Sequence, residues 1–155
     1  MFYRLVLDLH SWIRWLVLLT LIFAVYRSFK GWITASEFKR TDRIARNLAS
    51  ITVRVQFVIG VLLYVISPIT QYFISNIKQA WGIPQVAMFG WMHPVGMIIA
   101  IALISIGEVR SKKAADDHKK FTRVAIFYTI ALVIIFLSIP WPFMSNVSRP
   151  LFRTF

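Results

Sequence analysis

Four long runs of apolar residues divide the chain, with polar or basic stretches between them. The runs cover residues 5–26, 48–67, 86–107 and 123–143. A helix of about 20 residues crosses the roughly 30 Å hydrocarbon core of a bilayer, so each run is long enough to span a membrane. None of them alternates apolar and polar side chains as the strands of a membrane β-barrel do. The pattern predicts an all-α membrane protein with four transmembrane helices.

The stretch between the second and third runs has a pattern of its own. Pro68 ends the second run, and Gly82 with Pro84 precede the third. Between these breaks, apolar residues recur at helical spacing, at Ile69, Phe73, Ile77 and Ala80. This spacing predicts a short amphipathic helix that lies on the membrane surface and caps the bundle.

The connections between the runs are short, which favours an antiparallel arrangement of neighbouring helices. We therefore expect one domain, residues 1–155, built as an up-down bundle of four transmembrane helices. Thr41-Asp42 and Asp116-Asp117 are expected to cap helices that begin in the basic connections and continue into the second and fourth spans. Pro140 and Pro142 end the last helix.

Basic residues are distributed unequally between the two ends of the predicted bundle. The connection between the first and second spans holds six, at Arg27, Lys30, Lys39, Arg40, Arg43 and Arg46. The connection between the third and fourth also holds six, at Arg110, Lys112, Lys113, Lys119, Lys120 and Arg123. The opposite side holds four, at Arg4, Lys78, Arg149 and Arg153. Because cytoplasmic loops are enriched in Lys and Arg, this asymmetry predicts that both termini lie outside.

Composition narrows the chemistry available to this chain. The net charge of +12 is clustered beside apolar runs, which indicates membrane topology and contact with anionic headgroups, so no nucleic-acid partner is expected. The chain has no cysteine, which excludes disulfides, iron–sulfur clusters and covalently attached c-type haem. Candidate sites must therefore use histidine, carboxylate or arginine.

Two histidines lie inside apolar runs at similar predicted depth. His10 is about five residues inward from the outer end of the first span, and His93 is about seven inward from the outer end of the third, a difference of a few ångströms at about 1.5 Å per residue. Two imidazoles at matched depth on different helices can hold a haem iron between them. Arg14 follows His10 by one helical turn and is expected near a haem propionate. Otherwise, both histidines are interfacial residues bonded to backbone, and Arg14 reaches lipid phosphate or Asp8.

The other titratable residues suggest structural roles. His118 is expected to be a solvated histidine in the second basic connection, without a histidine partner on its side. Arg54 lies within the second span and is expected to pair with Glu108, with backbone carbonyls or with lipid phosphate. Only six acidic residues are present, almost all near the predicted interfaces, which argues against a carboxylate-bridged di-iron site or a proton relay. We expect no autonomous enzymatic activity.

Several short motifs resemble those of a known group of proteins. They are Leu9-His10-Ser11 with Arg14-Trp15, Gln56 with Gly60, Leu63-Tyr64 and Ser67-Pro68, and the closing Ile139-Pro140-Trp141-Pro142-Phe143 with Arg149-Pro150-Leu151-Phe152. Together they resemble the small four-span bacterial inner-membrane proteins labelled cytochrome b-like, over nearly the whole chain. The resemblance implies one haem b, electron transfer and a bacterial inner membrane, and it points to His10 and His93. Pro94 departs from this picture because the kink it introduces turns His93 either toward or away from the bundle core.

Two functions compete at this point. The first is a cytochrome b-like subunit that transfers electrons within a larger membrane complex, with His10 and His93 as iron ligands and a quinone or protein as redox partner. The second is an accessory subunit without a cofactor, which packs against other membrane subunits. A transporter or channel is disfavoured because Arg14 and Arg54 lie toward opposite faces of the membrane with no polar path between them.

Overall fold

The computed structural model describes residues 1–144, 147 and 149. Within these residues it contains helices and no strands. The elements are α1 (Phe2–Ile33), α2 (Arg40–Ile66), α3 (Pro68–Ser75), α4 (Ile77–Ala80), α5 (Pro84–Ala87), the π-helical segment η1 (Met88–Met92), α6 (His93–Lys112) and α7 (Asp117–Ser138). Four stretches are long and apolar enough to cross a membrane: α1, α2, the continuous helix Pro84–Lys112, and α7. The prediction of four membrane-spanning helices is confirmed.

The long helices extend beyond the predicted apolar runs. α1 has 32 residues and is therefore about 48 Å long, well over the thickness of a hydrocarbon core. α7 begins as predicted, because the Asp116 side chain accepts a hydrogen bond of 2.7 Å from the backbone N–H of Lys119. The predicted cap of α2 at Thr41-Asp42 is wrong in its position. The N-cap residue is Lys39. Asp42 lies in the first turn of the helix, and its side chain accepts a hydrogen bond of 2.9 Å from the backbone N–H of Lys39.

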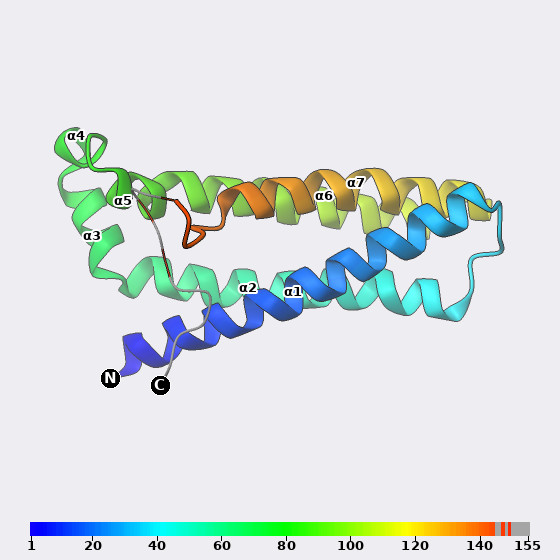
Figure 1. The fold of residues 1–155 in the computed structure, drawn as a ribbon, viewed down its shortest axis with the longest axis horizontal. Helices are drawn as coiled ribbons and strands as arrows, with labels where there is room; N and C mark the ends of the chain where they lie inside the picture. The colour runs from blue at the N-terminus through cyan, green and yellow to red at the C-terminus, as the bar shows by residue number, and fades with distance from the viewer. Residues whose placement is uncertain (145–146, 148, 150–155) are drawn as a thin grey trace.

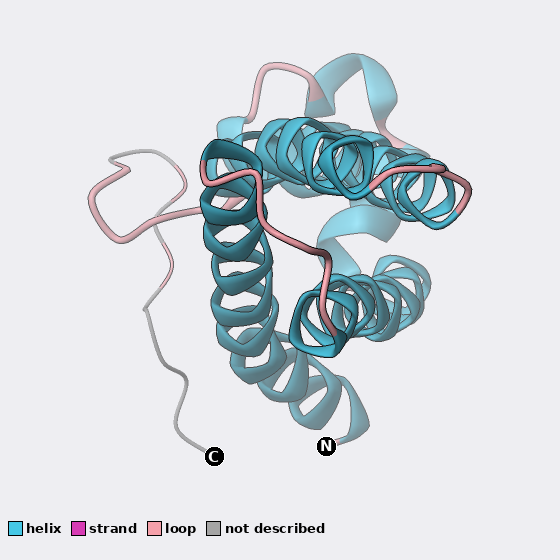
Figure 2. Cartoon of the chain, turned by 90° about the vertical axis from the view of Figure 1, so that its right-hand side faces the viewer, coloured by secondary structure: helices cyan, strands magenta, loops and turns pink. Residues whose placement is uncertain are grey.

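The long helices lie side by side, and each is reversed in direction relative to the one before it (Figure 1). α1 contacts α2 and α7, and α6 contacts α7 and α2, so the four close a ring in which each helix has two neighbours. α1 is inclined relative to the other three, as Figure 2 shows in a view along the bundle. α3, α4 and α5 connect α2 to α6 at the end where α1 begins (Figure 1).

The interior of the ring combines small and large apolar side chains. Leu21, Ile104 and Tyr128 are almost completely buried, and the alanines of each helix, such as Ala49 and Ala131, let the backbones approach closely. Only 28% to 39% of the most apolar window of each long helix is buried, and most large side chains outside the core are apolar. Such a surface belongs in a lipid bilayer.

Gly31 of α1 packs directly against α7. A Cβ atom built on Gly31 would lie 2.2 Å from Cζ of Phe121, a fully buried side chain of α7. Phe121 in turn contacts Phe38 of the α1–α2 connection, with ring centroids 4.8 Å apart. A residue with any side chain at position 31 would therefore separate the two helices or displace this aromatic pair.

The prediction of one continuous surface helix between the second and third spans is wrong, because the structure has two short helices there. The backbone of Asn76 leaves helical geometry, with φ −133° and ψ 42°, and divides the segment into α3 and α4. This break rotates the second half relative to the first. Phe73 and Ala80 are buried as the spacing predicts, but Ile77 is exposed. If the helical period is continued through Asn76, Ile77 is predicted to lie on the same face as Phe73, and this prediction is wrong.

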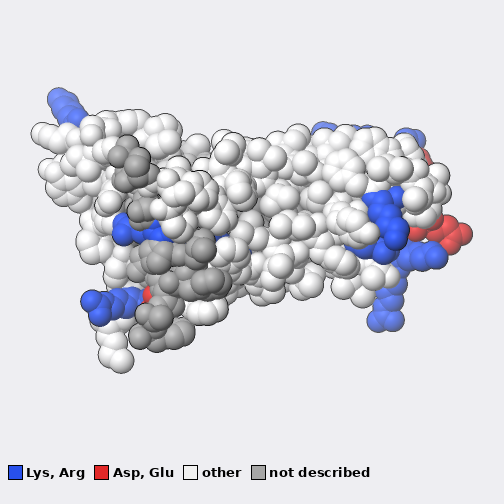
Figure 3. Space-filling model, in the orientation of Figure 1, with Lys and Arg blue, Asp and Glu red and all other residues white. Residues whose placement is uncertain are grey.

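Lys and Arg side chains gather at the end of the bundle opposite the N-terminus, over the α1–α2 and α6–α7 connections (Figure 3). This is the end that the sequence assigns to the cytoplasm. The histidine-bearing end carries the tryptophan contacts, with Trp15 against Trp141 and Trp81 against Trp91 at centroid distances of 6.3 and 4.9 Å. The two ends therefore differ in charge and in aromatic content, as membrane interfaces do.

Candidate functional site

His10 and His93 meet between the helices. His10 lies in the third turn of α1, His93 begins α6, and both are half-buried. Their ring centroids are 6.3 Å apart, and their ring planes are inclined at 74°. The structure thus brings together two residues that are 83 positions apart in the chain. The imidazole of His93 faces the interior, which resolves the two orientations that Pro94 left open.

The direction of His93 depends on the turn that precedes it. In the π-helical segment η1, the backbone N–H of His93 bonds to the carbonyl of Met88, five residues earlier. Each such wide turn shifts the following side chains around the helix axis, and π-turns occur often at functional sites. Pro94 lacks the N–H that would bond to Gly90 O in an α-helix. The Tyr64 hydroxyl of α2 donates to this oxygen instead, at 2.9 Å.

The ring of His93 is held in one tautomer. Its Nδ1 atom lies 2.9 Å from the backbone oxygen of Ser138, in the last turn of α7. A carbonyl oxygen can only accept a hydrogen bond, so Nδ1 carries the hydrogen and donates it. In the neutral imidazole, Nε2 then has a free lone pair. This arrangement, with one ring nitrogen bound to a carbonyl and the other available, is typical of metal-ligating histidines.

His10 differs because its Nδ1 atom is buried and has no hydrogen-bond partner among the described residues. The backbone oxygen of His10 accepts a hydrogen bond of 2.8 Å from Gln56 Nε2 of α2, which ties the two helices together at this level. Gly60 lies one turn further along α2, and a Cβ atom there would come within 3.3 Å of His10 Cε1. The ring therefore fits against a position that has no side chain. An unsatisfied buried nitrogen is uncommon and favours a bound partner.

Gln56 and Gly60 are the residues of this site that the sequence did not identify. Both lie on α2, and the structure shows that both contact His10. The only signal available in the sequence was a polar residue and a glycine one turn apart inside an apolar run.

Arg14 lies one turn beyond His10 on α1. Its guanidinium is 3.5 Å from the Ser11 hydroxyl and 5.5 Å from the centroid of the Trp15 ring. It is also close enough to both imidazoles to interact with them electrostatically. The structure thus places His10, Arg14 and His93, the three site residues predicted from the sequence, together at one end of the bundle.

Prolines at this end leave backbone carbonyl oxygens without their helical N–H donor, and side chains donate hydrogen bonds to these oxygens. The helical partners of Pro68, Pro94, Pro140 and Pro142 would be the oxygens of residues four positions earlier, but proline has no N–H to donate. Each of these oxygens accepts a side-chain donor instead. The pairs are Thr70 to Tyr64, Tyr64 to Gly90, Trp141 to Phe136 and His93 to Ser138. The histidine pair therefore lies in a network that fixes the ends of α2, α6 and α7.

The two rings are close enough that one metal ion could bind a nitrogen of each, at about 2 Å from either nitrogen. No group of three or more His, Cys, Asp or Glu residues is gathered as a metal site in the described part of the chain. Within these residues, His10 and His93 are therefore the side chains that would hold a metal between the rings.

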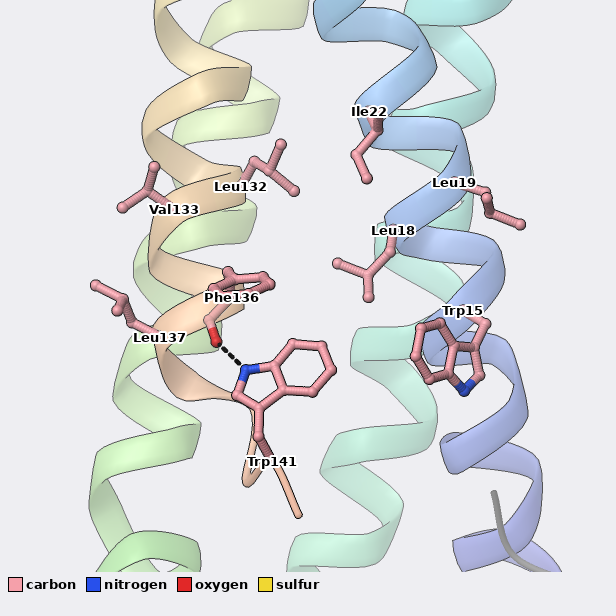
Figure 4. A pocket seen from close by; sticks show the side chains of 9 residues that line it. All are labelled: Trp15, Leu18, Leu19, Ile22, Leu132, Val133, Phe136, Leu137 and Trp141. Carbon is pink, nitrogen blue, oxygen red and sulfur yellow. Dashed lines mark hydrogen bonds between the residues drawn. The ribbon is translucent and has the colours of Figure 1, made fainter. Parts of the chain in front are cut away.

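The two best-defined pockets lie elsewhere. One is a groove of about 440 Å³ between α1 and α7, lined by apolar side chains. Figure 4 shows Leu18, Ile22 and Leu132 along its walls, with Trp15 and Trp141 at one end, where the Trp141 indole donates to Phe136 O. The second, of about 250 Å³, lies at the basic end between α6 and α7. Neither is lined by His10 or His93.

The basic end contains a separate polar cluster around Glu108, which is 4% exposed. Its carboxylate accepts hydrogen bonds of 2.6 Å from Ser50 and from Arg54, and it also pairs with Lys112. The pairing of Arg54 with Glu108 is one of the three predicted alternatives and is confirmed. Nearby, Arg46 donates to Ser111 at 3.1 Å. These contacts join α2 to α6 and suggest a structural role.

We expect Glu108→Gln to lower the free energy of unfolding by about 1–2 kcal/mol. The amide keeps the shape of the side chain but loses both ion pairs, and the effect is moderate because the Arg54 and Lys112 side chains are 47% and 49% exposed. Thermal unfolding in detergent micelles measures the change. Glu37→Gln, at an exposed acid without an ion pair among the described residues, is the matched control. Equal unfolding temperatures for the two variants would contradict the structural role of Glu108.

His118 is exposed, as predicted, but it belongs to the first turn of α7 and not to the connection before it. The reason is that the helix capped by Asp116 already includes position 118. The His118 ring contacts Trp32 of α1, with centroids 6.3 Å apart. It lies at the end of the bundle opposite to the His10–His93 pair, so it takes no part in that site.

Comparison with family models, with curated proteins and with solved structures finds no match to this chain.

Proposed function

We propose that this chain is a cytochrome b-like membrane subunit that binds one haem b between His10 and His93 and takes part in electron transfer. The observation that carries the proposal is the facing pair of imidazoles at 6.3 Å, one of them held with its Nδ1 hydrogen on Ser138 O. Burying polar rings inside a membrane is costly and usually serves a function.

The unpartnered Nδ1 of His10 adds an independent argument. In a purely structural pair, both rings would be expected to satisfy their buried nitrogens with backbone or side-chain groups. His93 does so, whereas His10 does not. Gly60 lets the His10 ring approach α2 closely, since a Cβ there would lie 3.3 Å from His10 Cε1. A bound cofactor at the pair would supply the partner that His10 lacks.

Arg14 is the proposed partner of a haem propionate. It is a cation within reach of both imidazoles at the end of the bundle where α1 begins, and guanidinium groups bind carboxylates well. The apolar side chains of the four helices supply a medium of low polarity around the pair, which influences the potential of a bound iron. When bound, the haem would carry one electron at a time between the ferric and ferrous states.

The proposed setting is the inner membrane of a bacterium, with both termini and the histidine end on the outer side. The distribution of Lys and Arg supports this orientation, because the helix ends near the α1–α2 and α6–α7 connections carry most of them. A chain with so little mass outside the bilayer needs another molecule to deliver and accept electrons. We propose a quinone or a further membrane subunit of the same complex for this role.

The decisive experiment is an absorption spectrum of the protein purified from haem-replete cells. We expect a Soret band, and sharp α and β bands on reduction, at one haem per chain by pyridine haemochrome assay. Two imidazole ligands on one iron give such a six-coordinate spectrum. Purified, folded protein without a Soret band, also after haem is added, would overturn the proposal.

The alternative is an accessory subunit that holds no cofactor. The observation that favours it is that the two rings already lie edge to face, with centroids 6.3 Å apart, so each ring fills the space beside the other. This alternative predicts a colourless protein that purifies in a fixed ratio with other membrane subunits. Mass spectrometry of a complex extracted in mild detergent, together with its spectrum, distinguishes the two functions.

A further inference from the structure

The pocket at the basic end brings together four cationic side chains. It is about 250 Å³ in volume and lies between the end of α6 and the start of α7. Arg110 and Lys113 line it from α6 and the following connection, and Lys119 and Arg123 line it from α7, with Ala114 as the remaining lining residue. Like charges at such spacing repel one another, so the arrangement is more favourable with an anion between them.

Negative charge from the protein is scarce at this pocket. Asp116 pairs with Lys119 at 2.9 Å, and it is the only carboxylate that forms an ion pair with these four cations among the described residues. The hydrogen bond from the Lys119 backbone N–H lowers the pKa of Asp116, so this carboxylate is charged at neutral pH and balances one cation. The group therefore keeps an excess of about three positive charges.

One of the cations is held in place. The Arg110 guanidinium lies over the ring of Phe127 of α7, 5.4 Å from the ring centroid. This contact spans the two helices and keeps the charge at the pocket instead of letting it extend freely into water. The guanidinium edges remain available for an oxyanion, to which arginine donates well.

Exposed apolar side chains continue from the pocket along the same helices. Ile106 precedes Arg110 by one turn on α6, and Ile126 and Ile130 follow Arg123 by one and two turns on α7. All three are 43% to 46% exposed. An anion bound here would thus have its charge among the four cations and, on the bilayer side, these three exposed isoleucines as an apolar track.

We propose that this pocket binds the phosphate headgroup of an anionic phospholipid, whose acyl chains lie along α6 and α7. The ligand is a lipid and not a free phosphate because the apolar track begins where the cations end. Basic pockets between membrane helices are the usual recognition sites for anionic headgroups. The site belongs to the leaflet at the basic end of the bundle, and it is independent of any haem at the other end.

The test measures lipid retention by native mass spectrometry of the whole protein, purified in mild detergent and mixed with equal amounts of phosphatidylglycerol and phosphatidylcholine. We expect phosphatidylglycerol to be retained preferentially. Replacing Arg110 and Arg123 by glutamine should reduce this preference at least about tenfold, because each cation near an anionic surface contributes several-fold to binding. Circular dichroism and thermal unfolding establish that the variant is folded.

The matched control is the double variant Arg40→Gln and Arg43→Gln. These exposed arginines lie at the same end of the bundle, in the first turns of α2, so the change in net charge is identical. We expect the control to retain phosphatidylglycerol within about twofold of the unmodified protein. An equal loss in both variants would mean that general electrostatics, and not the pocket, attracts the lipid, and would overturn the proposal.

Inorganic phosphate distinguishes the two possible sources of the anion. If the ligand is a lipid, millimolar phosphate should leave the retained phosphatidylglycerol unchanged, since it cannot occupy the apolar track. Displacement of the lipid by phosphate at that concentration would overturn the assignment to a phospholipid.

Discussion

Replacing either His10 or His93 by alanine should remove nearly all of the haem from the purified protein. Each substitution deletes one of two proposed axial ligands, and His93→Ala also leaves Ser138 O without its donor. The measurement is the ratio of Soret absorbance to protein absorbance, with haem quantified separately. We expect both single variants to show the same defect, because one imidazole alone cannot maintain a six-coordinate iron.

His118→Ala is the matched control, because it removes the remaining histidine from the opposite end of the bundle. Its spectrum should be that of the unmodified protein. Gel filtration of all three variants shows whether loss of haem accompanies loss of folding. If the His10 and His93 variants remain folded and keep the Soret band, the assignment of the ligands is incorrect.

Gly31→Val should strongly destabilise the fold. Its Cβ atom would lie 2.2 to 2.5 Å from three atoms of the Phe121 ring, and Phe121 is only 1% exposed. Overpacking of this kind costs about 1–3 kcal/mol, and the branched side chain of valine places the variant at the upper end. We expect a lower unfolding temperature in detergent and a smaller yield of folded protein.

The control for this change is Gly82→Ala, at the other end of the bundle. A Cβ atom on Gly82 would meet only the Gln79 backbone oxygen, at an ordinary 3.6 Å. The unfolding temperature of this variant should stay within about 2 °C of the unmodified protein. A Gly31→Val protein as stable as Gly82→Ala would show that α1 and α7 do not approach closely at this position.

The sequence predicts the long helices well because their signal is strong. Twenty apolar residues without a break have few alternatives to a membrane helix. The segment between the second and third spans was harder to predict, because a helical period does not show where the backbone leaves helical geometry. The backbone leaves it at Asn76, and Ile77 is exposed as a result.

Matched depth allowed His10 and His93 to meet, as one of two alternatives, but it could not give the geometry of the pair. The direction of His93 depends on the π-turn over Met88–Met92, which adds one residue to a helical turn without any distinctive sequence. Gln56 and Gly60 were not assigned to the site because spacing alone cannot show that a neighbouring helix presents a histidine to them. The orientation of the bundle in the membrane remains a prediction from charge.

Because His93 Nδ1 bonds to Ser138 O, the end of α7 sets the tautomer of a histidine ring on α6. Because α7 stops at Ser138 and Pro140 and Pro142 follow, no downstream N–H at those two positions competes for its last carbonyls. The imidazole therefore has no competing N–H donor from these two prolines, and its hydrogen stays on Nδ1. A substitution of Pro142 that restored a backbone N–H would therefore introduce a competitor for Ser138 O, the oxygen that now holds the His93 ring.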